Sequence, residues 1–161
     1  MQLLISDANI LIDLEEGELL AQLFALPYRF TVPDILYFEE LEAQHAHLCG
    51  MGLELAELSP ATLLYAMALI GRVSGPSRND CFALALARQE RCPLLSGDQA
   101  LREVAVLEAV EVKGTLWVVE ELVRAGVITV DTAHAAYDRM QANARRLPWL
   151  VAHQRLDALY R

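Results

Sequence analysis

The chain has 161 residues, the size of one domain with a substantial hydrophobic core. Hydrophobic residues make up 55% of it and charged residues 22%, which excludes an intrinsically disordered chain. No apolar run approaches the ~20 residues of a membrane span, and no basic stretch followed by an apolar one marks a signal peptide. We therefore expect a cytoplasmic protein without a membrane partner.

The formal net charge is -9, from 13 basic and 22 acidic residues. Taken alone, this charge disfavours a nucleic-acid partner, because a polyanion is repelled by an acidic surface. Some of the acidic residues can instead form a metal-binding cluster, where divalent ions would offset their charge. Net charge therefore does not decide between these classes of partner.

The sequence offers little for a metal site built on sulfur or imidazole. The three cysteines lack CxxC spacing, so neither a disulfide framework nor a thiolate zinc site is predicted; they are Cys49, Cys81 and Cys92. His45 and His47 lie two apart in a predicted helix, where they should point to different faces. His134 and His153 stand alone, so we expect no histidine metal site.

In the first half of the chain, predicted strands and helices alternate. An apolar run at residues 3–5 ends abruptly in the polar segment 6–9, as a buried strand does when it delivers a carboxylate at its tip. The elements predicted next are a helix at 17–26, a strand at 29–32, a helix at 34–48, a strand at 53–58 and a helix at 59–73.

A loop of turn-forming residues at 74–77 separates the two halves. Asn79 is the expected N-cap of the next helix. The elements predicted after the loop are a helix at 80–90, a strand at 92–96, a helix at 99–107, a strand at 110–112, and helices at 115–124, 131–145 and 148–159.

This alternation predicts an α/β fold with a doubly wound, mostly parallel five-stranded sheet flanked by helices. Residues 1–113 would form the sheet domain, and residues 114–161 a helical extension packed on it. The extension carries many apolar residues, among them Trp117, Tyr137 and Trp149. They either cover one face of the sheet or form a partner surface, and on the second alternative we expect a homodimer.

Carboxylates follow the predicted strands at matching places. Asp7 ends the first strand, Asp80 opens a helix after the central loop, and Asp98 ends the fourth strand. Glu39 and Glu40 lie in the helix after the second strand. If the first and fourth strands are neighbours, Asp7 and Asp98 converge above the carboxyl edge of the sheet, where α/β proteins place their ligands.

Each acid also has an ordinary structural explanation. Asp80 and Asp98 suit the first turns of helices, Asp7 suits a turn, and the two glutamates suit a solvated surface. Several acids at one end of a sheet nevertheless form a set of oxygen ligands without His or Cys, which is typical of Mg²⁺ or Mn²⁺. Such ions activate water for phosphodiester hydrolysis.

Four segments carry a resemblance to a known family, in that family's order. They are residues 5–12 (ISDANILI), 32–41 (VPDILYFEEL), 79–87 (NDCFALALA) and 94–102 (LLSGDQALR). They resemble the four acidic motifs of PIN-domain ribonucleases, and segments 114–117 (GTLW) and 126–128 (GVI) resemble the C-terminal part of one bacterial and archaeal PIN subgroup.

The resemblance implies a Mg²⁺- or Mn²⁺-dependent endoribonuclease that cleaves single-stranded RNA, often as the VapC-like toxin of a toxin-antitoxin pair with a cognate antitoxin protein. Carried over by position, the catalytic and metal-binding acids are Asp7, Glu40, Asp80 and Asp98, with Asn9 and Ser96 as polar neighbours. Leu41 favours Glu40 as the glutamate, whereas the spacing from Pro33 favours Glu39, and the choice stays open.

Other functions fit the sequence less well. A catalytically inactive PIN-like module would bind RNA or a protein, but such modules usually lack site acids that this chain retains. A phosphoacceptor receiver domain needs an acidic pair after the first strand, and Asp7 has no acidic neighbour, although Lys113 is suitably placed. A haloacid-dehalogenase-type phosphatase needs Asp-x-Asp, and Asn9 occupies its second position.

Overall fold

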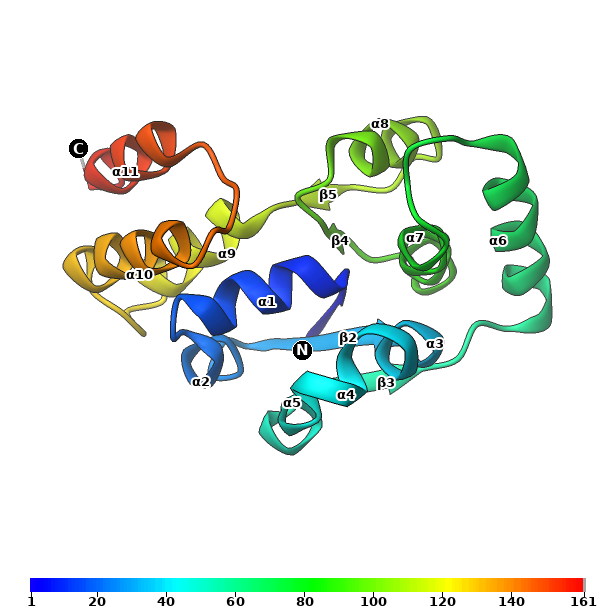
Figure 1. The fold of residues 1–161 in the computed structure, drawn as a ribbon, viewed down its shortest axis with the longest axis horizontal. Coiled ribbons are helices and arrows are strands. Elements are labelled where there is room, and N and C mark those ends of the chain that lie inside the picture. The colour runs from blue at the N-terminus through cyan, green and yellow to red at the C-terminus, as the bar shows by residue number, and fades with distance from the viewer. Residues whose placement is uncertain (161) are drawn as a thin grey trace.

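The computed structural model describes residues 1–160 and contains a five-stranded, fully parallel sheet in the order β3-β2-β1-β4-β5 (Figure 1). The strands are β1 (Gln2–Ser6), β2 (Tyr28–Pro33), β3 (Glu54–Ala56), β4 (Leu94–Leu95) and β5 (Val112–Lys113). The predicted fold class, α/β with a parallel doubly wound sheet, is confirmed.

The strand order reverses beside β1, which pairs with β2 on one side and with β4 on the other. In the register of β1 with β4, Ile5 lies opposite Leu94 and Ser6 opposite Leu95. The carboxyl ends of both strands therefore point to the same edge, as expected from the sequence. Such a switch point is where open α/β sheets bind their ligands.

Helices surround the sheet, and the last three of them, α9 to α11, form a group at the C-terminal end of the chain. They are α1 (Ala8–Glu16), α2 (Leu20–Leu23), α3 (Asp34–Leu36), the π-helix η1 (Tyr37–Leu41), α4 (Glu42–His45), α5 (His47–Met51), α6 (Pro60–Arg72), α7 (Arg78–Glu90), α8 (Gln99–Leu107), α9 (Thr115–Arg124), α10 (Val130–Ala142) and α11 (Trp149–Ala158). α1, α9 and α10 gather on one side, and α6 and α7 lie together on the other (Figure 1). No helix within residues 1–160 is both long and apolar enough to cross a membrane.

One continuous hydrophobic core joins the sheet to the C-terminal helices. Leu4 and Ile5 of β1, Val119 of α9, Tyr137 of α10 and Leu156 of α11 are all buried in it. The apolar residues of the extension therefore mainly cover the sheet domain, because burying them removes their surface from water. In α11, Leu150 and Val151 are exceptions, with 73% and 46% of their surfaces exposed.

Three local predictions were wrong. Residues 8–16 form α1, directly after the first strand, whereas only four residues of the predicted helix 17–26 are helical. The predicted helix 34–48 contains a π-helical turn and a break at Ala46. Ser77, not Asn79, caps α7, because its hydroxyl accepts the N–H of Asp80. The helices predicted at 99–107 and 115–124 match α8 and α9.

Candidate active site at the carboxyl edge of the sheet

Asp7 is the buried centre of the site. Its side chain is almost fully enclosed, at 1% exposure, and its Oδ1 caps α1 by accepting the N–H of Ile10 at 3.0 Å. Oδ2 is also buried and has no hydrogen-bond partner among the described residues. Burial raises the pKa of Asp7 to about 7 and outweighs the lowering effect of the nearby Ser96 and of the Ile10 N–H.

Asp80 reaches the same region from the first turn of α7. Its Oδ2 accepts the backbone N–H of Ser77 at 2.9 Å, and its own N–H is capped by the Ser77 hydroxyl at 3.1 Å. This reciprocal capping box fixes the carboxylate. The Asp80 charge adds to the raised pKa of Asp7, so these two acids repel each other.

Asp98 occupies the corresponding position after β4. Its Oδ1 accepts the N–H of Leu101 at 2.9 Å and so caps α8, while its own N–H donates to the Ser96 hydroxyl at 3.1 Å. Ser96 is fully buried beneath it. Hence Asp7, Asp80 and Asp98 each use one carboxylate oxygen at the start of a helix.

The two adjacent glutamates have different environments. Glu39 Oε2 accepts the amide of Asn79 at 3.0 Å, and its Oε1 lies 3.7 Å from Arg78. Burial and then repulsion by Asp80 raise the pKa of Glu40. The Asn79 amide lies close enough to lower that pKa in part, although the bond of good geometry is to Glu39. Glu40 therefore belongs electrostatically with Asp80, and Glu39 with Arg78.

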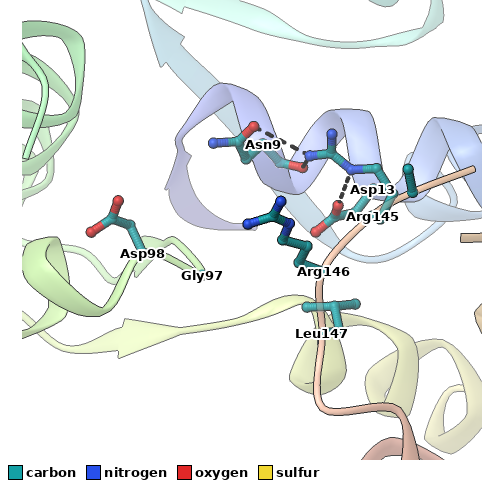
Figure 2. Close-up of a pocket in the computed structure, with 8 residues that line it drawn as sticks. Asn9, Asp13, Gly97, Asp98, Arg145, Arg146 and Leu147 are labelled. Atoms are coloured by element: carbon teal, nitrogen blue, oxygen red, sulfur yellow. Dashed lines mark hydrogen bonds and ion pairs between the residues drawn. The ribbon is translucent and has the colours of Figure 1, made fainter. Parts of the chain in front are cut away.

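A cleft of about 540 Å³ opens between Asp98 and α1. Figure 2 shows Asn9 and Asp13 on α1 at one wall, Asp98 across the space, and Arg145 and Arg146 arriving from the segment after α10. The Arg146 side chain points into the gap between α1 and Asp98. The cleft thus lies between Asp98 at the sheet edge, Asp13 on α1 and two arginines of the C-terminal extension, and Asp98 is the one of the four predicted site acids that lines it.

Asp13 is a site residue that the sequence reasoning missed. It is buried at 6% exposure, accepts the Thr115 hydroxyl at 2.7 Å, and adds to the raised pKa of Asp7. A sequence signal existed, because Asn9 and Asp13 are four residues apart and therefore share one face of a helix. No helix was predicted between the first strand and residue 17, so that signal was not used.

The acids suit a hydrated divalent cation rather than one held by all four side chains at once, because among the described residues no three of these carboxylates bring oxygens within 4.8 Å of one another. A buried carboxylate oxygen without a partner is costly, and the repulsion among Asp7, Glu40 and Asp80 adds to that cost. An ion coordinated by these oxygens would relieve both effects. Hard cations such as Mg²⁺ or Mn²⁺ prefer such ligands.

Comparison with known proteins now decides the family. A family model described as DUF3368, PIN domain, matches residues 3–160. The chain belongs to the PIN-domain family. This match confirms the family resemblance that the four acidic segments indicated. The receiver-domain and phosphatase alternatives are therefore wrong. The match includes nearly all of the C-terminal extension as well as the sheet region.

This PIN domain was also compared with curated proteins and with solved structures. No curated protein matches its sequence. A solved PilT N-terminus domain protein from the hyperthermophilic archaeon Sulfolobus solfataricus P2 is 14% identical, with a TM-score of 0.49 over 78% of this chain and 92% of that chain. PIN domains are generally nucleases that use divalent metals, so the acidic cleft of this PIN domain is its candidate active site.

Proposed function

We propose that this PIN domain is a Mg²⁺- or Mn²⁺-dependent endoribonuclease that cleaves single-stranded RNA. The observation that carries the proposal is the unpartnered, buried Oδ2 of Asp7, at a sheet edge where other carboxylates repel it. Asp7, Glu40, Asp80 and Asp98 would hold the metal. When bound, the ion would activate water and stabilise the charge that develops on the phosphate.

The surroundings favour a phosphodiester substrate. The first turns of α1, α7 and α8 lie at the acids, and the positive ends of their helix dipoles favour an anion there, although one side-chain cap already occupies each N-terminus. Arg146 is exposed at the mouth of the cleft, where its guanidinium can bind a phosphate in bidentate fashion. The chain itself would thus bind and orient the substrate backbone.

A second cleft of about 480 Å³ supports an extended, single-stranded substrate. It shares Gly97 and Leu147 with the acidic cleft, so the two form one path along the surface. Its lining includes Arg102, Lys113, Trp117 and Arg155. The Lys113 ammonium lies 4.8 Å from the centre of the Trp117 ring. Basic groups beside an aromatic ring suit the phosphates and bases of an unpaired strand.

The direct test is cleavage of an unstructured, fluorescently labelled RNA by the metal-free protein after addition of Mg²⁺ or Mn²⁺. We expect cleavage with either ion, none in chelator, and none from an Asp98→Asn protein purified in parallel. Duplex RNA and single-stranded DNA of the same sequence are the substrate controls. If the protein binds RNA but does not cleave it at any metal concentration, the nuclease proposal is wrong and the protein is an inactive RNA-binding PIN module.

The toxin role implied by the resemblance, with a cognate antitoxin, stays a prediction, as does a homodimer. Expression of the active chain should arrest growth of its host if the protein is a toxin, and an adjacent small gene should relieve that arrest. Growth equal to that of cells expressing Asp98→Asn would exclude the toxin role while leaving the nuclease proposal intact.

A further inference from the structure

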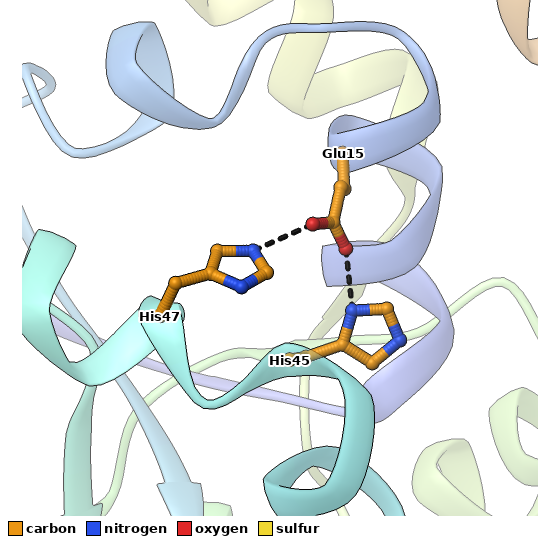
Figure 3. A group of neighbouring side chains, drawn as sticks. All are labelled: Glu15, His45 and His47. Carbon is orange, nitrogen blue, oxygen red and sulfur yellow. Dashed lines mark hydrogen bonds and ion pairs between the residues drawn. The ribbon is translucent and has the colours of Figure 1, made fainter.

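A second cluster of ligating side chains lies away from the acidic cleft, at the other end of α1. Glu15 is in the last turn of α1, about 12 Å along the helix from Asp7 at ~1.5 Å per residue. Its Oε2 contacts His45 Nδ1 at 2.5 Å, and its Oε1 contacts His47 Nε2 at 2.5 Å. Figure 3 shows the two imidazoles converging on the one carboxylate.

The convergence contradicts the expectation that these histidines point to different faces of a helix. Residues two apart would diverge in a regular helix, but α4 ends at His45, Ala46 forms a turn, and α5 begins at His47. The break lets both rings turn toward α1. The break in the helix at Ala46 therefore allows both imidazoles to contact the same carboxylate.

Three atoms that can ligate a metal ion meet here. One oxygen of Glu15 and one nitrogen from each of His45 and His47 all lie within 4.8 Å of one another. Each histidine contacts a different oxygen of the same carboxylate. No Arg or Lys among the described residues forms an ion pair with Glu15, so a cation would compete there only with the protons of the two imidazoles.

We propose that Glu15, His45 and His47 form a second metal site, selective for a borderline divalent transition ion such as Zn²⁺. Two imidazoles and one carboxylate are a ligand set used for Zn²⁺ and related ions, whereas Mg²⁺ prefers oxygen alone. Three protein ligands leave a fourth position open. The His47 side chain is 47% exposed, so an ion can enter from solvent.

Burial of the neighbouring residues holds the ligands ready. Leu14 precedes Glu15 and is fully buried, and Leu48 follows His47 with 1% exposure. Both segments are thereby fixed to the core before an ion arrives, which reduces the entropy lost on binding. A bound ion would tie α1, whose first turn is capped by Asp7, to the helical segment that also carries Glu40.

The test is a Zn²⁺ titration of the metal-free full chain against a chromophoric chelator, in excess Mg²⁺ to keep the oxygen-only cleft occupied. We expect one tight Zn²⁺ per chain. His45→Ala and His47→Ala should each weaken binding at least ~10-fold, because even loss of a group that only orients a ligand costs ~10–100-fold. Glu15→Gln should also weaken binding.

The matched control is His134→Ala, which removes an imidazole from the pair in which His134 Nδ1 lies 2.6 Å from His153 Nδ1. It should leave the Zn²⁺ affinity unchanged. Co²⁺ absorption gives a second readout, since its visible spectrum reports imidazole ligation and should change in His47→Ala, a half-exposed position where the fold is retained. Less than one Zn²⁺ per wild-type chain, or equal affinity in the wild type and both histidine variants, would overturn the proposal. Neither measurement depends on nuclease activity.

Discussion

Arg145 Nε donates to Asp13 Oδ1 at 2.6 Å and joins the segment after α10 to the helix that Asp7 caps. Arg145 also donates to the Asn9 side chain at 3.2 Å. The Asp13 side chain is 9% exposed and that of Arg145 24%, so the pair is largely shielded from water. The C-terminal extension is thereby part of the wall of the acidic cleft.

Arg145 and Arg146 are adjacent but should respond differently to substitution. Arg145→Ala leaves the buried Asp13 carboxylate without its cation, which we expect to cost on the order of 2–4 kcal/mol of unfolding free energy. Arg146→Ala removes an exposed group and should leave stability unchanged while weakening RNA binding. Chemical denaturation and RNA titration at two salt concentrations measure both effects. Equal loss of stability in the two variants would contradict the separate roles.

Asp7→Asn should abolish cleavage, lowering the rate by more than ~100-fold, because it removes a charged oxygen that a cation needs. The same substitution should stabilise the metal-free protein above pH 7. Asn still accepts the Ile10 N–H with its oxygen, and the buried negative charge is gone. Asp131→Asn, an exposed acid of α10, is the control. Wild-type rates in Asp7→Asn would remove this residue from the site.

The stability of the metal-free protein should fall as pH rises from about 4 to about 7. The pKa of Asp7 is about 7 in the folded state against 3.8 in the unfolded chain, so within this window only the unfolded state releases the proton and is favoured. The loss should reach a few kcal/mol, at ~1.4 kcal/mol per pKa unit. Denaturation of wild type and Asp7→Asn across this range measures the contribution of Asp7 as the difference between the two slopes, because Glu40, whose pKa is also raised, contributes to both. Equal slopes in the two proteins would contradict the prediction.

Divalent metal should stabilise the folded protein, because only the folded state assembles the acids. At a Mn²⁺ concentration ~100-fold above its dissociation constant, the gain is ~2.7 kcal/mol. This corresponds to a rise in Tm of ~5–10 °C for a chain of this size. Thermal melts with Mn²⁺ and with EDTA measure the shift. Midpoints that coincide in the wild type would count against a metal site in the cleft.

Glu39→Gln and Glu40→Gln distinguish the two glutamates. Glu40 shares the electrostatic environment of Asp80, whereas Glu39 contacts Asn79 and Arg78. We therefore expect Glu40→Gln to reduce cleavage by ~10-fold or more and to raise the Mn²⁺ concentration needed for half-maximal activity. Glu39→Gln should change both by less than ~3-fold. A larger effect at Glu39 would reverse the assignment.

The structural explanation of the aspartates and the functional one turn out to be compatible. The sequence suggested that Asp7 is a turn residue, and that Asp80 and Asp98 serve helix termini, as alternatives to a site. In the structure, one oxygen of each serves a helix N-terminus. A carboxylate has two oxygens, so the same residue can cap a helix and still present a charge to the cleft.

The sequence by itself determined the parallel α/β fold, the family, and the placement of Asp7 and Asp98 at one sheet edge. These follow from local patterns, since buried strands are short apolar runs and a carboxylate after such a run must lie at the edge where the strand ends. The helices at 99–107 and 115–124 were predictable for the same reason, because their caps and periodicity lie within the segment.

Only the tertiary structure decided the groups that meet across the sequence. Arg145 reaches Asp13 over 132 positions, and His45 and His47 meet Glu15 across a helix break that no local pattern shows. The different environments of Glu39 and Glu40 likewise depend on α7. Such contacts arise from the packing of distant helices on one sheet, and the free energy of that packing, rather than local propensity, sets which side chains face each other.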